Sequence, residues 1–108
     1  MEGAKHQLNN GDLNYLETGK LNLARAALAR AEKNTKRRWN NGWKRPKWLK
    51  AGHQFNEAAF LFCQANEKQH GRDALLSAYQ CFKQKRAWYY AAKTLEQVVA
   101  LNLSLIHI

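Results

Sequence analysis

The sequence has few residues that could cross-link a small protein through disulfides or metal ions. Its 108 residues include only two cysteines and four scattered histidines. Cys63 and Cys81 have neither the spacing of a metal pair nor the number that a disulfide framework needs. We therefore expect two small, buried thiols and no metal or other cofactor.

The chain also lacks the segments that send proteins into or across membranes. No apolar run approaches the roughly twenty residues that a membrane-spanning helix needs. The N-terminus has no basic region followed by an apolar one, as a signal peptide would. Glycine is at position 3 rather than position 2, so the N-myristoylation pattern is missing. These absences predict a soluble cytoplasmic protein.

Catalytic motifs are missing as well. No glycine cluster opens a predicted helix to hold a phosphate group. Ser77 and Ser104 lack the flanking glycines of a serine nucleophile. We expect no enzymatic activity.

Acidic residues are scarce, and the excess positive charge is concentrated in one segment. The chain has 18 Lys and Arg against 8 Asp and Glu, a net charge of +10. Residues 36–50 contain seven of the cations, no acid and three of the four tryptophans. Gly42 and Pro46 predict a loop here, and Pro46 predicts that a helix begins near Lys47.

A basic loop with tryptophans indicates contact with an anionic partner. At a membrane, each cation contributes about 1 kcal/mol and the indole rings lie at the headgroups. On nucleic acid, the cations would neutralise phosphates and the indoles would stack on unpaired bases. The alternative is that tryptophans, Trp48 above all, fold back to cap the helices. The candidate membrane contacts are Arg37, Arg38, Trp39, Trp43, Lys44, Arg45, Lys47, Trp48 and Leu49.

Apolar periodicity predicts helices on both sides of this loop. One helix covers about 12–34, and three more follow at about 47–67, 72–83 and 87–101. Because the connections are short, neighbouring helices should be antiparallel. Residues 13–100 would form one helical-hairpin domain containing the loop 36–50. Residues 1–12 are expected to be a flexible N-terminus, and residues 101–108, which are uncharged, an irregular or non-native tail.

Two of the predicted helices match at an offset of 33 residues. The matched pairs are Phe55 with Trp88, Ala58 and Ala59 with Ala91 and Ala92, Phe62 with Leu95, and Ala65 with Val98. A two-helix period in the low thirties is typical of tetratricopeptide repeats. The alternative is two amphipathic helices that share alanines by chance. The prediction is an all-α fold of antiparallel helical hairpins, a tetratricopeptide-like solenoid fragment.

A smaller basic cluster lies around the last predicted turn. Its residues could contact an acidic protein partner, or they could simply complement the dipole of a helix C-terminus. The candidate partner contacts are Lys83, Lys85, Arg86 and Lys93.

The stretches 55–65 and 83–97 resemble repeats of the soluble NSF attachment protein family, closest to the gamma type. The order of elements also fits: a helix ending in Ala31-Glu32-Lys33, a loop of Trp, Lys and Pro, then hairpins of helices with paired alanines. The resemblance covers roughly residues 26–100 and rests on patterned alanines and aromatics.

The resemblance implies a cytoplasmic, peripheral-membrane adaptor in vesicle and ER–Golgi transport. Such an adaptor binds SNARE complexes and recruits the NSF ATPase, which disassembles them, and its loop, here Trp39–Leu49, attaches to membranes. The family's chain continues for many more helices, so this copy is expected to be truncated and unable to recruit the ATPase. The alternatives are a helical protein that binds single-stranded nucleic acid and a general tetratricopeptide-type interaction scaffold.

Overall fold

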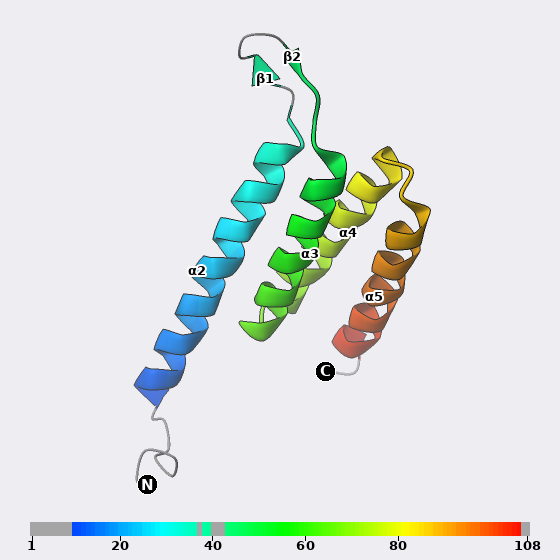
Figure 1. Cartoon of the computed structure of the whole chain (residues 1–108). Helices are drawn as coiled ribbons and strands as arrows, with labels where there is room; N and C mark the ends of the chain where they lie inside the picture. Colours follow the sequence, from blue (N-terminus) through cyan, green and yellow to red (C-terminus); the bar gives the residue numbers. More distant parts are fainter. Residues whose placement is uncertain (1–9, 37, 40–42, 107–108) are drawn as a thin grey trace, which may run out of the picture.

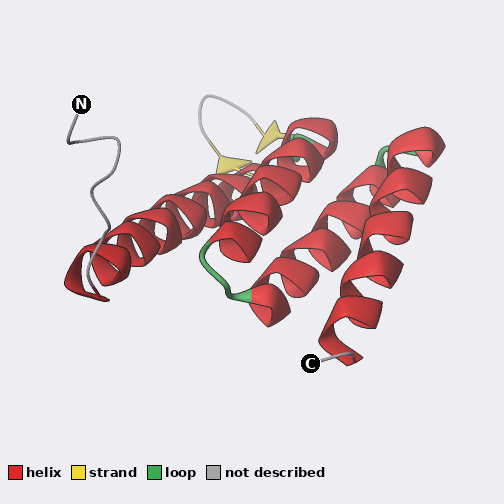
Figure 2. Cartoon of the chain, turned by 90° about the horizontal axis from the view of Figure 1, so that it is seen from below, coloured by secondary structure: helices red, strands yellow, loops and turns green. Residues whose placement is uncertain are grey.

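The computed structural model describes residues 10–36, 38–39 and 43–106 of the chain. Nearly all of this part is helical, in four helices: α2 (Asn10–Asn34), α3 (Trp48–Gln64), α4 (Lys68–Gln84) and α5 (Trp88–Ile106). The helices run alternately up and down and pack in chain order, α2 on α3, α3 on α4 and α4 on α5 (Figures 1 and 2). The predicted all-α fold of helical hairpins is confirmed.

Both predicted end segments are more helical than expected. Residues 10–12 belong to α2, so the prediction of a flexible segment is wrong for them, and residues 1–9 lie outside the described part. The predicted irregular tail is helical as far as Ile106. Leu101 packs against the core there, and the Lys68 ammonium of α4 donates a 3.1 Å hydrogen bond to the Ser104 hydroxyl. These contacts hold the last turns of α5 in place.

Small side chains fill the core and let the helices approach closely. One cluster of buried residues joins all four helices, and a second lies nearer the connection between α2 and α3. The first consists of Ala24, Ala27, Ala58, Ala59, Phe62, Ala74, Leu75 and Val98, and the second of Ala31, Ala51, Phe55, Ala78, Cys81, Phe82 and Ala91. Two glycines bring α3 and α4 still closer, because a Cβ atom at Gly52 would lie 2.6 Å from the Phe82 ring and one at Gly71 would lie 2.6 Å from Cys63 Sγ.

The 33-residue match places equivalent residues in different surroundings. Phe55 and Phe62 of α3 are 4% and 2% exposed, because both pack against α4. Their counterparts in α5, Trp88 and Leu95, are 61% and 42% exposed. Ala92 is exposed as well, although its counterpart Ala59 is buried. Within the described residues, α3 packs between α2 and α4, whereas the main neighbour of α5 is α4 alone. Tyr90 of α5 also meets His53 of α3, with ring centroids 4.8 Å apart.

The two tight turns of the stack have the same backbone geometry. Asn66 and Arg86 adopt left-handed conformations with φ of 62° and 59°. In each turn the next residue donates its N–H to the carbonyl five positions back, Glu67 to Phe62 and Ala87 to Phe82, both at 2.8 Å. This is the Schellman arrangement that satisfies the last carbonyls of a helix. It forms here without the glycine usually found at that position.

Candidate functional site

A basic depression lies where α2 ends and α3 begins. Its volume is about 340 Å³. Two helix ends and the segment between them supply its walls, so residues far apart in the sequence meet there. The lining residues are Arg30, Lys33, Asn34, Lys36, Arg45, Lys47, Lys50 and Gln54.

The two helix ends are tied together at this depression. The Lys47 N–H donates a 2.7 Å hydrogen bond to the Asn34 carbonyl, so the chain returns to the point at which it left α2. The Asn34 side-chain amide donates a second hydrogen bond to Gln54 Oε1 on α3. Arg30 and Lys33 are one helical turn apart on α2, as are Lys50 and Gln54 on α3. The walls are therefore fixed relative to each other.

The connection between the helices contains a short hairpin stem that the sequence did not indicate. Strand β1 (Arg38–Trp39) pairs antiparallel with β2 (Trp43–Lys44), with Arg38 opposite Lys44 and Trp39 opposite Trp43. The predicted loop is thus a small β-hairpin above the helix ends (Figure 1). The β-propensity of tryptophan favours this pairing.

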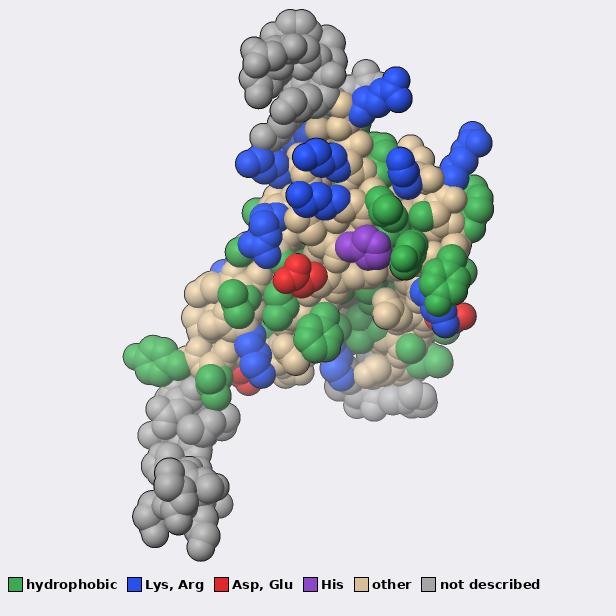
Figure 3. All heavy atoms as spheres, in the orientation of Figure 1, with side chains coloured by type: hydrophobic (Ala, Val, Ile, Leu, Met, Phe, Trp, Pro, Cys, Tyr) green, Lys and Arg blue, Asp and Glu red, His purple; other side chains and the backbone are tan. Residues whose placement is uncertain are grey.

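The described lining of the depression has six cationic side chains and no acidic one. Glu32 lies in the last turns of α2, but steps of about 100° per residue turn it away from Arg30. None of the six cations forms an ion pair within the described ranges, where the ion pairs involve His70, Arg72 and Lys93. Figure 3 shows Lys and Arg side chains gathered over the adjoining ends of α2 and α3. This arrangement favours an anionic ligand.

The ends of α2 and α3 also affect the electrostatic potential in the depression. The first turn of α3 has no acidic residue, and Lys47 makes no side-chain hydrogen bond that caps it. The free N–H groups of a helix N-terminus attract anions. Lys33 in the last turn of α2 offsets the partial negative charge of that helix end.

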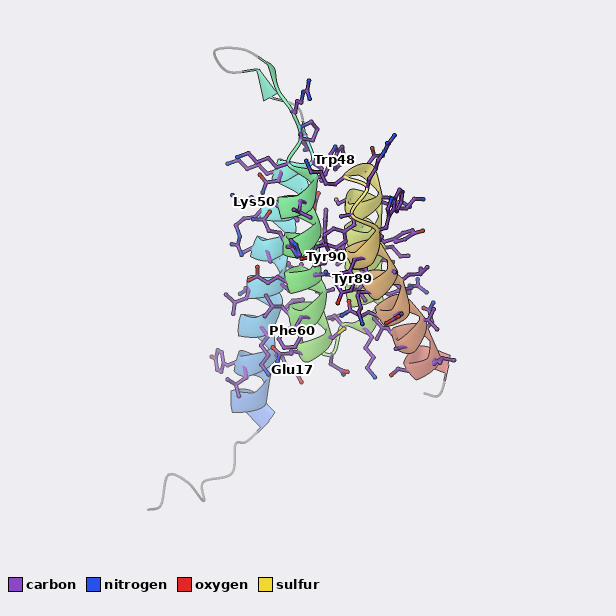
Figure 4. All side chains as sticks on the ribbon, turned by 45° about the vertical axis from the view of Figure 1, so that its right-hand side comes forward. Glu17, Trp48, Lys50, Phe60, Tyr89 and Tyr90 are labelled. Carbon is purple, nitrogen blue, oxygen red and sulfur yellow. The ribbon has the colours of Figure 1, made fainter. Side chains whose placement is uncertain are left out.

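The predicted membrane contacts are distributed unevenly around this region. Arg45 and Lys47 line the depression, and Leu49 beside it is exposed. Trp48 is half-buried and packs against the core cluster around Phe82, so the interpretation that it folds back is confirmed. Figure 4 shows Trp48 and Lys50 leaving α3 on different sides.

The remaining predicted contacts lie in or beside the hairpin. The structure describes only the backbone of β1 and β2, and Arg37 lies outside the described residues. Membrane contact by Arg38, Trp39, Trp43 and Lys44 therefore stays a prediction.

Sequence reasoning missed half of the depression. It did not single out Arg30, Lys33, Asn34 or Gln54, and it included Lys36 and Lys50 only as part of the basic segment. A usable signal existed, because basic residues one turn apart end one predicted helix and begin the next. A short antiparallel connection must bring such helix ends together.

The second basic cluster does not line the depression. The Lys83 ammonium lies 5.1 Å from the centre of the Tyr79 ring, and that of Lys93 lies 4.0 Å from Glu96 Oε2. Lys85 and Arg86 are exposed in the α4–α5 turn, which is at the same end of the stack as the depression (Figure 1). Their contact with an acidic protein partner stays a prediction.

An apolar groove separates α3 from α5. Its volume is about 470 Å³, and its walls include Phe60, Cys63 and Leu101. Asn56 Oδ1 at its edge is buried and has no hydrogen-bond partner among the described residues.

Burial raises the pKa of the Cys63 thiol, with Lys68 opposing the shift, so the thiol is a weak nucleophile at neutral pH. In the described part of the chain, no three His, Cys, Asp or Glu side chains come together to hold a metal ion.

Fold and site together define an all-α protein of antiparallel helical hairpins with one strongly basic end. None of its described helices has the length and apolar character to cross a membrane. No protein-family model matches the chain. The search of curated proteins also gives no significant match.

Proposed function

We propose that this protein is a helical-hairpin adaptor that attaches to anionic membrane surfaces through its basic end. The observation that carries the proposal is the set of six cations that line one depression, with no acidic side chain among its described lining residues. Each Lys or Arg near an anionic leaflet contributes about 1 kcal/mol. Six would give at most about 6 kcal/mol, which corresponds to a dissociation constant between millimolar and micromolar. Such binding is reversible, as expected of a peripheral protein.

The composition of the depression favours a membrane over single-stranded nucleic acid. Proteins that bind single strands stack the bases on aromatic side chains beside their cations. Among the side chains that the structure describes, the lining of the depression contains no aromatic one. Trp48, the described tryptophan closest in sequence, is packed against the core instead.

The uncovered face of α5 supplies the protein-binding part of the proposed adaptor. In α3, the residues equivalent to Trp88 and Leu95 are covered by α4. We expect a partner helix with an apolar stripe to cover α5 in the corresponding way. By the family resemblance, the partner would be a SNARE complex in vesicle transport.

Sedimentation with lipid vesicles tests the attachment. We expect binding to vesicles that contain phosphatidylserine and none to neutral phosphatidylcholine, with loss at high salt, where the Debye length falls to about 3 Å at 1 M. The double variant Lys33→Glu with Lys50→Glu should bind much less. The control, Lys20→Glu with Arg25→Glu, makes the same charge change on an exposed part of α2 away from the depression.

Two results would contradict the proposal. Equal binding to neutral and anionic vesicles would remove its electrostatic basis. A stronger response to a single-stranded oligonucleotide than to anionic vesicles, followed by tryptophan fluorescence, would favour the nucleic-acid alternative.

A further inference from the structure

We infer that the basic depression binds a single headgroup with two or three phosphate groups on a small hydroxylated ring, as in the phosphoinositides. This inference rests on the proposed attachment to anionic membranes and makes its ligand specific. A flat, diffuse contact would need only total charge. The depression instead concentrates its cations around one small volume.

The charge of the depression matches several phosphates and exceeds that of an ordinary anionic lipid. Six side chains carry six formal positive charges. A phosphate monoester carries about −1.5 to −2 at neutral pH. Three such groups, or two together with a phosphodiester, would balance most of the site. One phosphatidylserine headgroup would leave most of the cations without a partner.

The size of the depression also suits one headgroup. Its volume of about 340 Å³ lies at the lower end of the range for small-molecule sites, about 300–1,000 Å³. Arg30 and Arg45 come from different segments, and each has a planar guanidinium that can hold a phosphate through two parallel hydrogen bonds. Lys33, Lys47 and Lys50 supply point charges among them.

Two uncharged side chains can recognise the hydroxyl groups of the ring. Asn34 uses an amide N–H to bond Gln54 Oε1. This leaves the Asn34 carbonyl oxygen as an acceptor and the Gln54 N–H groups as donors, with no other hydrogen bond to these side chains among residues 10–36, 38–39 and 43–106. A hydroxyl group both donates and accepts, so this pair complements a polyol.

The depression is formed before any ligand arrives. The Asn34–Gln54 bond joins the two helices, and the Lys47 N–H to Asn34 carbonyl bond fixes the start of α3. A prearranged site loses less entropy on binding than one that must order its walls. The depression can therefore distinguish a compact headgroup from a dispersed charge.

Charge-matched vesicles test the inference. One set contains phosphatidylcholine with phosphatidylserine, and the other phosphatidylcholine with phosphatidylinositol bisphosphate, mixed to the same total negative charge. We expect binding to the bisphosphate set that is tighter by about tenfold or more, equivalent to about 1.4 kcal/mol. Lys33→Gln with Lys50→Gln should abolish the preference, whereas Lys20→Gln with Arg25→Gln should retain it.

Gln54→Leu separates headgroup recognition from charge, because it alters no cation. We expect this variant to lose part of the preference for bisphosphate vesicles, measured as the ratio of its binding to the bisphosphate set and to the phosphatidylserine set. Thermal unfolding of each variant checks that it is folded. The inference that this depression binds the headgroup would be overturned if both Gln54→Leu and the double lysine variant kept the full preference for bisphosphate vesicles.

The outcomes separate the inference from the proposed function. Equal binding to the two charge-matched sets would overturn the inference and leave the membrane proposal standing, and binding to neither set would overturn both. Titration with soluble inositol trisphosphate distinguishes the source of the ligand. Competition with bisphosphate vesicles would support a shared site, whereas tight binding of the soluble compound without any vesicle preference would assign the same chemistry to a soluble ligand.

Discussion

The close contact between Gly52 and Phe82 predicts that Gly52→Ala destabilises the fold, although glycine-to-alanine changes inside helices usually stabilise it. A Cβ atom at Gly52 would lie 2.6, 2.8 and 2.9 Å from three carbons of the Phe82 ring. This ring is completely buried and is enclosed by the rings of His53 at 5.1 Å and Tyr90 at 5.3 Å. Because the ring is already packed against these two neighbours, Gly52→Ala must displace the helices or the ring.

Gly19 provides a matched control for the substitution. It also lies inside a helix, but a Cβ atom there would meet nothing within 4 Å. Gly19→Ala should therefore stabilise the fold by about 1 kcal/mol, the gain in helix propensity. Gly52→Ala gains the same amount but incurs an overpacking cost of about 1–3 kcal/mol. Because the propensity gain is common to both, the difference between the two variants isolates the packing cost.

Chemical and thermal unfolding followed by circular dichroism measure this difference. One kcal/mol corresponds to about 4–8 °C in Tm for a domain near this size. The Gly52→Ala variant should unfold at a clearly lower temperature than Gly19→Ala. If Phe82→Leu is introduced first, Gly52→Ala should become less harmful, since neighbouring substitutions couple. Equal stabilisation by both alanines would refute the close packing of α3 on α4.

Three further predictions follow from burial, backbone geometry and the titration of a thiol. Phe55→Ala should lower the free energy of unfolding, measured in urea, by about 3–5 kcal/mol. Trp88→Ala at the matched position should lower it much less, because Trp88 is 61% exposed. Similar losses of stability in the two variants would contradict the exposure of this face of α5. Arg86→Gly should raise stability by about 1 kcal/mol by relieving its left-handed backbone, and a lower Tm would count against that geometry. Burial raises the pKa of the Cys81 thiol to about 11 from its ordinary value of 9.0, so the unfolded chain releases this proton at a lower pH than the folded chain does. The free energy of unfolding should therefore fall as the pH rises from about 9 to about 11. Cys81→Ala should show a smaller fall, and an identical fall would contradict the burial of this thiol.

The helices of this protein could be predicted because their signal is local. Alanines and aromatics at three- and four-residue steps define one face of each helix. Phe55, Ala58 and Phe62 are buried as that pattern predicts. The tail could not be predicted in this way, because contacts with α4 hold residues 101–106 in a helix.

Burial on α5 shows where the sequence pattern stops being sufficient. The repeat matches Trp88 and Leu95 with the buried Phe55 and Phe62, but a face is buried only if another element covers it. Thr94, a polar residue, is 1% exposed instead. Which side of an amphipathic helix meets a neighbour depends on the order and crossing of the helices, and this information is not in the helix itself.

The basic site was predictable in charge but not in shape. The concentration of cations in residues 36–50 located it, yet Arg30 and Gln54 join it only because α2 and α3 are antiparallel. Trp48 shows the converse, since its sequence position placed it among the cations and its packing placed it against the core. A count of charges along the chain cannot separate these two cases.

Comparison of the two Schellman turns shows that this turn geometry does not require the positive charge of Arg86. Asn66 and Arg86 occupy the same left-handed position in otherwise equivalent turns. Asparagine is among the residues enriched in this conformation, whereas arginine is not. The turn at the end away from the depression has Asn66 followed by Glu67, and the turn at the basic end has Lys85 and Arg86. Backbone strain that local structure does not require is a reason to look for function, and here the strained residue adds a cation to the end proposed to meet the membrane.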